Sequence, residues 1–248
     1  MGMDELLENR ERYVMVAVSA GNEENAEESL RELKELARTA NAEVVCRLIQ
    51  NLPHPDPATY VGSGKVKEIS LLLEEMDADG IICDDELTPA QMKNLSDTLN
   101  CKVIDRTILI LDIFAGHAHS NEGKLQVEMA QLKYRASHLA GWGKALSRLG
   151  GGIGTRGPGE TKLETDRRTI EHRISVLSAQ MKRMMESRNT ARKQRMRNRM
   201  PVAALVGQTN AGKSTLLNHL TGSSVKSEDL LFATLDPTTR SCLLPDGQ

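Results

Sequence analysis

One short segment towards the C-terminal end of the chain carries a residue pattern with a specific chemistry. Residues 207–214 have the sequence Gly-Gln-Thr-Asn-Ala-Gly-Lys-Ser and fit G-x-x-x-x-G-K-[ST], the pattern of a phosphate-binding loop. The glycines let the backbone approach a polyphosphate closely, and successive N–H groups form a concave site for its charge. Lys213 is expected to reach the β- and γ-phosphates, and the Ser214 hydroxyl to bind Mg²⁺. The segment therefore predicts a nucleoside triphosphate site.

The residues on either side of this loop have the pattern that such a site needs. Residues 202–206 form a short apolar run, which predicts a buried parallel strand. Leu216, Leu217 and Leu220 follow at helical spacing, and Gly222 is suited to end that helix. The N-terminus of the helix would add its partial positive charge to the anion site. This context disfavours the alternative, a glycine-rich turn with an unrelated lysine.

The composition limits what the rest of the chain can be. Its 248 residues allow one large domain or two to three small ones. Only 2% of the residues are aromatic, so the core has to be aliphatic. The four cysteines have no spacing typical of disulfides or metal sites, which indicates reduced thiols in a cytosolic protein. We expect no membrane-spanning segment, because no long apolar stretch is present, and no signal peptide is recognisable.

Residues 1–116 alternate between strand and helix patterns. The β-rich or apolar runs cover residues 13–19, 43–49, 80–84 and 101–105, and helical spacing covers 24–40, 66–76, 88–100 and 107–115. This order and the short connections predict an α/β domain with a parallel sheet covered by helices. Thr88, Pro89 and Gln91 have the pattern of a capping box at the start of one helix.

A second glycine-rich segment lies inside this domain. Residues 62–65, with the sequence Gly-Ser-Gly-Lys, follow a proline-rich loop and superficially resemble half of a phosphate-binding loop. We interpret them as a turn and a helix N-terminus, because so short a pattern is weak evidence of a site. A secondary anion or nucleotide site is the alternative.

Residues 117–200 predict a hairpin of two long helices. Apolar or small residues alternate at spacings of four and three from Leu125 to Leu146, and similarly from Leu163 to Met184, which is typical of a single coiled-coil seam. The glycine-rich segment 150–160 allows the chain to reverse, so we expect antiparallel helices that pair with each other. At about 1.5 Å per residue, the hairpin would extend roughly 40–50 Å and hold its tip away from the sheet.

Basic residues around the tip and in the second helix favour contact with nucleic acid. Glycines would admit close approach of a phosphate backbone, and the cations would meet its charges. The candidates are Gly151, Gly152, Arg156, Gly157 and Lys162 at the tip, with Arg192 and Arg195 in the basic run 182–199. His138 and Trp142 could stack on bases. The alternatives are a solvated hairpin with a flexible connector and, for the basic run, a solvated helix face.

Together these segments resemble the HflX-type GTPases over the whole chain. The matching segments are residues 60–65, 151–161, 207–214 and 231–240, the last with the sequence Leu-Phe-Ala-Thr-Leu-Asp-Pro-Thr-Thr-Arg. The resemblance implies an α/β protein with a parallel-sheet N-terminal domain over 1–116, a long antiparallel helical hairpin over 117–200 and an incomplete P-loop GTPase domain over 201–248.

The resemblance also implies a function. Members bind GTP or GDP with Mg²⁺, associate with the large ribosomal subunit and its rRNA through a hairpin tip directed towards the catalytic centre, and split or rescue stalled ribosomes. It implies a cytoplasmic protein, with peripheral association at a membrane or the ribosome as alternatives.

Carried over residue by residue, the resemblance makes residues 232–240 switch I. Thr234 is the first choice for the threonine that binds Mg²⁺ and senses the γ-phosphate, and Thr238 is the second. The nucleotide-binding candidates are Gly207, Gln208, Thr209, Asn210, Ala211, Gly212, Lys213, Ser214, Thr215, Phe232 and Thr234, of which Ser214 and Thr234 would bind the metal.

No catalytic residue is assigned. The family's later motifs, Asp-x-x-Gly and Asn-Lys-x-Asp, do not occur before Gln248, so guanine preference follows from the resemblance alone. We therefore expect a fragment that hydrolyses GTP negligibly, because the positioning of Mg²⁺ and of the attacking water would be incomplete.

Two other functions stay open on the residues alone. The chain could be an RNA-binding module that ignores nucleotide, or an ATP-dependent RNA remodeller that uses the N-terminal domain. Competition between GTP and ATP would separate the remodeller from the GTPase. Salt-dependent RNA binding without a nucleotide effect would support the module. No DNA partner is expected.

Overall fold

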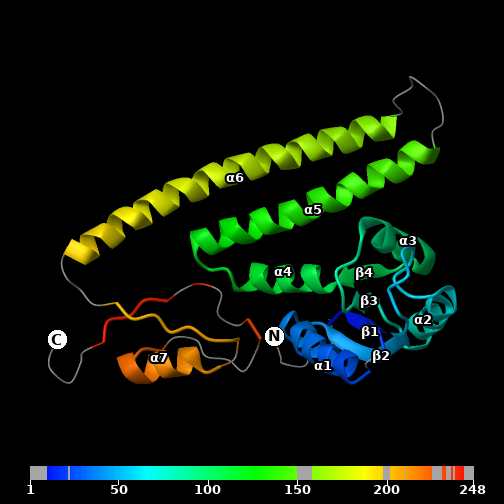
Figure 1. Cartoon of the computed structure of the whole chain (residues 1–248), viewed down its shortest axis with the longest axis horizontal. Coiled ribbons are helices and arrows are strands. Elements are labelled where there is room, and N and C mark those ends of the chain that lie inside the picture. Colours follow the sequence, from blue (N-terminus) through cyan, green and yellow to red (C-terminus); the bar gives the residue numbers. More distant parts are fainter. Residues whose placement is uncertain are drawn as a thin grey trace.

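The N-terminal part of the chain folds around a parallel sheet (Figure 1). The computed structural model describes residues 10–21, 23–149, 158–197, 202–209, 211–224, 231–232, 236 and 238–242, with the side chains of 140–149, 158–163 and 195–196 left out. The four strands are β1 (Arg12–Ser19), β2 (Glu43–Asn51), β3 (Gly80–Cys83) and β4 (Lys102–Asp105). Their order is β2-β1-β3-β4 and every pairing is parallel. This confirms the predicted parallel sheet.

Helices cover both faces of the sheet. They are α1 (Glu23–Thr39), α2 (Ser63–Glu75), α3 (Pro89–Leu99) and α4 (Arg106–His117). Alternate residues of β1 point to opposite faces, as the pleat of a strand requires. Val14 packs in one buried cluster with Ile69 of α2, whereas Met15 packs in the other with Leu33 of α1. Both faces of the central strands are therefore dry, which explains why these strands have continuous apolar sequences.

Local signals set where the helices begin. The predicted capping box at α3 is confirmed, because the Thr88 hydroxyl accepts a hydrogen bond from Gln91 N at 3.3 Å and Thr88 N donates to Gln91 Oε1 at 2.9 Å. Asp105 caps α4 in the same way and accepts from Ile108 N at 2.8 Å. Asp105 is also fully buried, so it lies where the end of β4, the start of α4 and the core meet.

The two long helices form the predicted antiparallel hairpin. They are α5 (Asn121–Leu149) and α6 (Pro158–Arg197), and they pack along each other (Figure 1). Arg173 of α6 pairs with Glu128 of α5 at 2.7 Å, and Leu177 is buried in the seam. At 40 residues, α6 is about 60 Å long and exceeds the roughly 40–50 Å that we expected for the hairpin, whereas α5, with 29 residues, is about 44 Å long. Proline favours the first position of a helix, where no backbone N–H is needed.

The predicted pairing of the two helices is confirmed, and α5 also packs against α3 and α4. Tyr134 and His138 make polar contacts on this side of α5, which an apolar periodicity does not detect. The hairpin is therefore attached to the sheet region along part of α5. Among the helices in the described part of the chain, none is long and apolar enough to cross a membrane.

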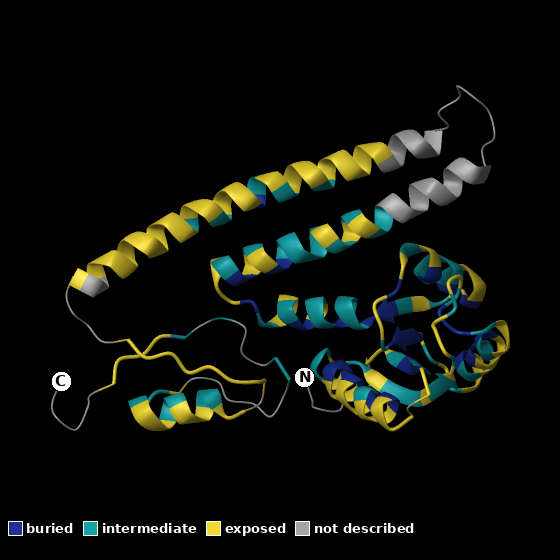
Figure 2. Cartoon of the chain, in the orientation of Figure 1, coloured by how far each residue is buried: buried dark blue, intermediate teal, exposed yellow. Residues whose placement is uncertain are grey.

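The C-terminal part contains the helix α7 (Lys213–Thr221). The predicted buried strand over residues 202–206 is wrong: no strand is present there, and the side chains of Val202 and Val206 are 73% and 91% exposed (Figure 2). A strand needs a neighbour for its backbone hydrogen bonds. Within the described residues after 201, no second strand lies beside this run, so its backbone stays without a ladder.

Candidate nucleotide site

The predicted phosphate-binding loop turns directly into α7. Gly212 is the N-cap residue of this helix, with φ of 77°, a backbone conformation that glycine adopts without strain. No side chain caps the helix, and a Cβ at Gly212 would meet nothing within 4 Å. The first backbone N–H groups of α7 point out of this end of the helix, as in any α-helix. The arrangement leaves space at a helix N-terminus, where an anion is favoured.

The lysine of the motif folds back across the loop. Lys213 Nζ donates a hydrogen bond to the Gln208 carbonyl oxygen, and Ala211 N donates to the same oxygen at 3.4 Å. The ammonium group is therefore held at the loop and not extended into solvent. A phosphate at the loop would offer this ammonium a charged acceptor in place of a neutral carbonyl, which is the stronger hydrogen bond.

The structure describes most of the predicted nucleotide-binding residues. Gly207, Gln208, Thr209, Ala211, Gly212 and Thr215 are exposed, whereas Lys213 and Ser214 are half-buried at the start of α7. Asn210 and Thr234 lie outside the described residues, so the predicted metal pair of Ser214 and Thr234 is described only at Ser214. A left-handed glycine, a helix N-terminus and an ammonium group are together a donor set that fits a phosphate group.

Phe232, another nucleotide-binding candidate, lies against the N-terminal region. Its ring meets that of Phe114 of α4 edge to face, with centroids 5.1 Å apart and planes at 88°. It packs against the buried cluster that contains Leu109 and Ile113 of α4. Its backbone has a φ of 57°, which is strained for a bulky residue. The described contacts of Phe232 are thus packing contacts with α4.

Asp236 is a residue that we did not single out from the sequence. Its carboxylate accepts hydrogen bonds from His119 N at 2.9 Å, from Ser120 N at 2.6 Å and from the Ser120 hydroxyl. The Ser120 hydroxyl is the largest of the causes that lower the pKa of Asp236. Ser120 lies immediately before α5, so Asp236 ties the predicted switch I to the start of the hairpin. The sequence alone shows that Asp236 is acidic, and acidic side chains are favoured near helix N-termini. It does not show which helix the residue contacts.

The hairpin has a second anchor on the sheet region. The Tyr134 hydroxyl of α5 donates to Asp105 Oδ2 at 2.7 Å, and His138 Nε2 lies 3.2 Å from the Leu87 carbonyl oxygen. The rings of Tyr134 and His138 are stacked, with centroids 4.0 Å apart. Burial, and then the bond to Asp105, raises the pKa of Tyr134, so the hydroxyl remains a donor. His138, which we expected to stack on bases, is instead engaged within the protein.

The other RNA candidates are described only in part. Gly151, Gly152, Arg156 and Gly157 lie outside the described residues, as do the side chains of Trp142, Lys162 and Arg195. Arg192 is exposed on α6, in keeping with a cation available to a partner. Arg188 of the same basic run pairs with Glu122 of α5 at 2.6 Å, so part of the run has a structural role.

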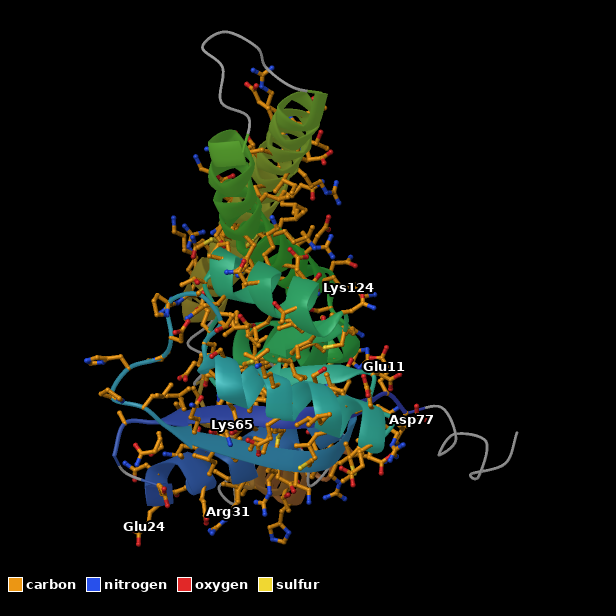
Figure 3. All side chains as sticks on the ribbon, turned by 90° about the vertical axis from the view of Figure 1, so that its right-hand side faces the viewer. Glu11, Glu24, Arg31, Lys65, Asp77 and Lys124 are labelled. Carbon is orange, nitrogen blue, oxygen red and sulfur yellow. The ribbon has the colours of Figure 1, made fainter. Side chains whose placement is uncertain are left out.

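The second glycine-rich segment is a helix start. Gly62 is the N-cap of α2, and its N–H donates to Gln50 Oε1 at 2.9 Å. Lys65, labelled in Figure 3, pairs with Glu68 of the same helix at 2.8 Å. This confirms the interpretation as a turn and a helix N-terminus, and it leaves the lysine with a local partner.

Three family models match the chain in succession. They are the GTP-binding GTPase N-terminal model over residues 27–115, the GTP-binding GTPase middle region over 117–195 and the 50S ribosome-binding GTPase over 202–247. Among solved structures, SsGBP in complex with GDP has a TM-score of 0.53 at 23% identity, and the match covers 86% of this chain and 56% of that one. That likeness supports the fold, and the family match over residues 202–247 shows the start of a P-loop GTPase domain.

Curated relatives are much more similar in sequence. The GTPase HflX of Lacrimispora saccharolytica is 57% identical over 244 residues, which are 98% of this chain and 58% of that protein. The GTPase HflX of Escherichia coli K12 is 46% identical over 214 residues, 86% of this chain and 50% of that protein. The chain thus spans 50–58% of the length of these relatives. Identity of this order along three consecutive family regions shows that the chain belongs to the HflX-type GTPases.

Proposed function

We propose that the protein binds GTP and, in that form, associates with the large ribosomal subunit to control ribosome splitting or rescue. The intact protein would hydrolyse the GTP and so end the association. The observation that carries this proposal is the phosphate-binding loop, with Gly212 in the left-handed conformation and Lys213 folded over the loop. The loop lies within residues 202–247, which match the 50S ribosome-binding GTPase model.

In this proposal residues 207–215 hold GTP or GDP. The Lys213 ammonium would leave the Gln208 carbonyl for the β- and γ-phosphates, and the backbone N–H groups at the start of α7 would take the remaining phosphate oxygens. Ser214 and Thr234 would hold Mg²⁺, which neutralises phosphate charge when bound. Without GTP, Phe232 would attach switch I to α4, since its ring is packed against Phe114.

The ribosome would be contacted through the hairpin. The family matches support a division into an N-terminal domain over 1–116, a hairpin over 117–200 and a GTPase domain from 201. The tip residues Gly151, Gly152, Arg156, Gly157 and Lys162, together with Arg192 and Arg195 of α6, would contact rRNA, where glycines admit the backbone and cations meet phosphates. The anchor between Tyr134 and Asp105 would hold α5 in a constant direction on the sheet region. The protein would act in the cytoplasm.

A matched pair of lysine variants tests the nucleotide site. Lys213→Ala removes a charged donor to phosphate, so GTP should bind about 10- to 100-fold more weakly, as hydrogen bonds to charged groups contribute about 1.5–3 kcal/mol. Lys65→Ala is the control, because it removes the lysine of the other Gly-x-Gly-Lys segment, which pairs with Glu68. Binding is measured by titration calorimetry with GTP, GDP and ATP. Equal loss in both variants, or preference for ATP, would contradict the proposal.

Co-sedimentation with purified large ribosomal subunits tests the partner. The intact chain with a non-hydrolysable GTP analogue should sediment with the subunits, and deletion of residues 150–159 should abolish this. Equal binding with and without nucleotide would support an RNA-binding module instead. Binding unaffected by the deletion would move the contact to the basic run 182–199.

A further inference from the structure

The predicted switch I is attached to the corner between α4 and α5 at two points. Asp236 accepts three hydrogen bonds from His119 and Ser120, although Ser120 lies 116 residues earlier in the chain. Phe232 packs edge to face on Phe114 of α4. We call these two attachments the switch latch. The two residues that make it flank Thr234, the first choice for the metal-binding threonine.

We propose that the switch latch couples the nucleotide to the root of the hairpin: GTP withdraws Asp236 and Phe232 from the α4–α5 corner, and GDP leaves them in place. The inference rests on the proposed function, since it needs a nucleotide at the phosphate-binding loop. It goes further by naming the contacts through which the nucleotide acts on the hairpin and the residues, Asp236 and Phe232, that position switch I.

The short chain between Asp236 and the threonines sets the bond of Asp236 to Ser120 against binding of a threonine at the nucleotide. Thr234 and Thr238 each lie two residues from Asp236, and two extended residues span at most about 7 Å. While Asp236 stays bonded to Ser120, neither threonine can move far from the start of α5. In switch-type GTPases it is contact with the γ-phosphate and its Mg²⁺ that orders this segment. A threonine that moves to the nucleotide by more than this reach would therefore draw the Asp236 carboxylate with it.

The backbone of Phe232 favours release. Its φ of 57° is a conformation that a bulky side chain rarely adopts, and it persists here because the ring is packed against α4. When the segment leaves α4, this strain is relieved. At Phe232, favourable packing of the ring on Phe114 is thus opposed by an unfavourable backbone conformation. Because the two contributions oppose each other, both the attached and the released positions of the segment are accessible.

Release would change the first turn of α5 and little beyond it. Asp236 accepts from the N–H groups of His119 and Ser120, which immediately precede this helix, and places a negative charge near its positive end. The bond between Tyr134 and Asp105 fixes α5 further along and does not involve switch I. The nucleotide would thus loosen the root of the hairpin while the second anchor stays in place.

One glycine offers a selective way to open the latch. Gly123 is buried in the first turn of α5, and a Cβ there would overlap Asp236 Oδ1. Gly123→Ala should expel the carboxylate while making the helix itself more favourable, because alanine is the better helix former. Gly116→Ala is the matched control, since a Cβ at Gly116 of α4 would meet nothing within 4 Å. Phe114→Leu is a second variant, which weakens the aromatic contact but keeps an apolar side chain.

The experiment uses the full chain and two measurements. The first is the ratio of affinities for a non-hydrolysable GTP analogue and for GDP, and the second is amide hydrogen exchange at His119 and Ser120. Gly123→Ala should raise the ratio at least about fivefold in favour of the GTP analogue, the lower end of ordinary allosteric coupling. It should also speed exchange at both amides without nucleotide, as the GTP analogue should do in the unmodified chain. Phe114→Leu should change the ratio in the same direction, and Gly116→Ala should change neither quantity.

The outcomes separate the latch from the proposed function. Normal nucleotide binding with an unchanged affinity ratio in Gly123→Ala and Phe114→Leu would overturn the latch and leave the proposed function intact. Faster exchange in Gly123→Ala, with no effect of the GTP analogue on the unmodified chain, would make Asp236 a fixed cap and also overturn the inference. Failure of the unmodified chain to bind either nucleotide would overturn both.

Discussion

The sheet region and the segment before the phosphate-binding loop place similar apolar residues in opposite environments. Ile82 of β3 is 0% exposed between two layers of helices, whereas Val206 is 91% exposed (Figure 2). Both lie in short apolar runs, which are consistent with buried strands. The difference is that β3 has a strand on either side, and residues 202–206 have none among the described residues. An apolar run thus becomes a buried strand only where neighbouring strands complete its hydrogen bonds.

Truncating one apolar side chain in each region sharpens this comparison and should give the largest effect. Ile82→Ala should cost about 3–4 kcal/mol of the free energy of unfolding, because it removes buried atoms and leaves a cavity. Val206→Ala should change the free energy by less than about 0.5 kcal/mol, as expected for an exposed site. Urea unfolding followed by circular dichroism measures both. A cost above about 1.5 kcal/mol for Val206→Ala would show that residues 202–206 are buried in solution.

The buried carboxylate of the sheet region gives the next largest effect. Asp105 accepts hydrogen bonds from Leu87 N, Ile108 N and the Tyr134 hydroxyl. Asp105→Ala leaves these donors without their acceptor and should cost about 3 kcal/mol in unfolding free energy. Tyr134→Phe removes only the bond to the hairpin and should cost about 1 kcal/mol. The same urea titrations measure both, and equal costs would mean that the hairpin anchor accounts for the whole role of Asp105.

Sequence reasoning succeeded where the signal and the contact are close in the chain. The capping box at Thr88 and Gln91 involves residues three positions apart, and the continuous apolar run of β1 indicates its own burial on both faces. The helix at Ser63 began where a turn and glycines indicated. In each case the physical cause, a cap or a periodic apolar face, is contained within a few residues.

It failed where the partner is distant and polar. The bond between Tyr134 and Asp105 joins positions 29 residues apart, and that between Asp236 and Ser120 joins positions 116 apart. Neither hydrogen bond leaves a periodic pattern of apolar residues or a short motif in the sequence. His138 was interpreted as a base-stacking residue for the same reason, since its partner, the Leu87 carbonyl oxygen, has no side-chain signature. Long-range hydrogen bonds that orient one region on another require the three-dimensional arrangement.

The smallest expected effect is a loss of unfolding free energy at acid pH, caused by one ion pair of the sheet region. Glu11, labelled in Figure 3, accepts from Lys102 Nζ at 2.7 Å and so links the residue before β1 to β4. This bond is the main cause that lowers the pKa of Glu11 below its ordinary value of 4.5, and it raises the pKa of Lys102 to about 12. A carboxylate with a lowered pKa contributes stability above its unfolded-state pKa and loses it as the pH falls through the folded value.

The contribution of the pair should therefore be present from about pH 5 to 10 and lost below pH 4.5. Both side chains are more than half exposed, so solvent screening limits it to under about 1 kcal/mol. Glu11→Gln should lower the unfolding free energy slightly at pH 7, and this deficit should shrink as the pH falls through the lowered pKa of the Glu11 carboxyl. Glu35→Gln, which removes an exposed pair with Arg38 within α1, is the control. A deficit in Glu11→Gln that stays constant as the pH falls would show that packing of the side chain, and not its charge, joins β1 to β4.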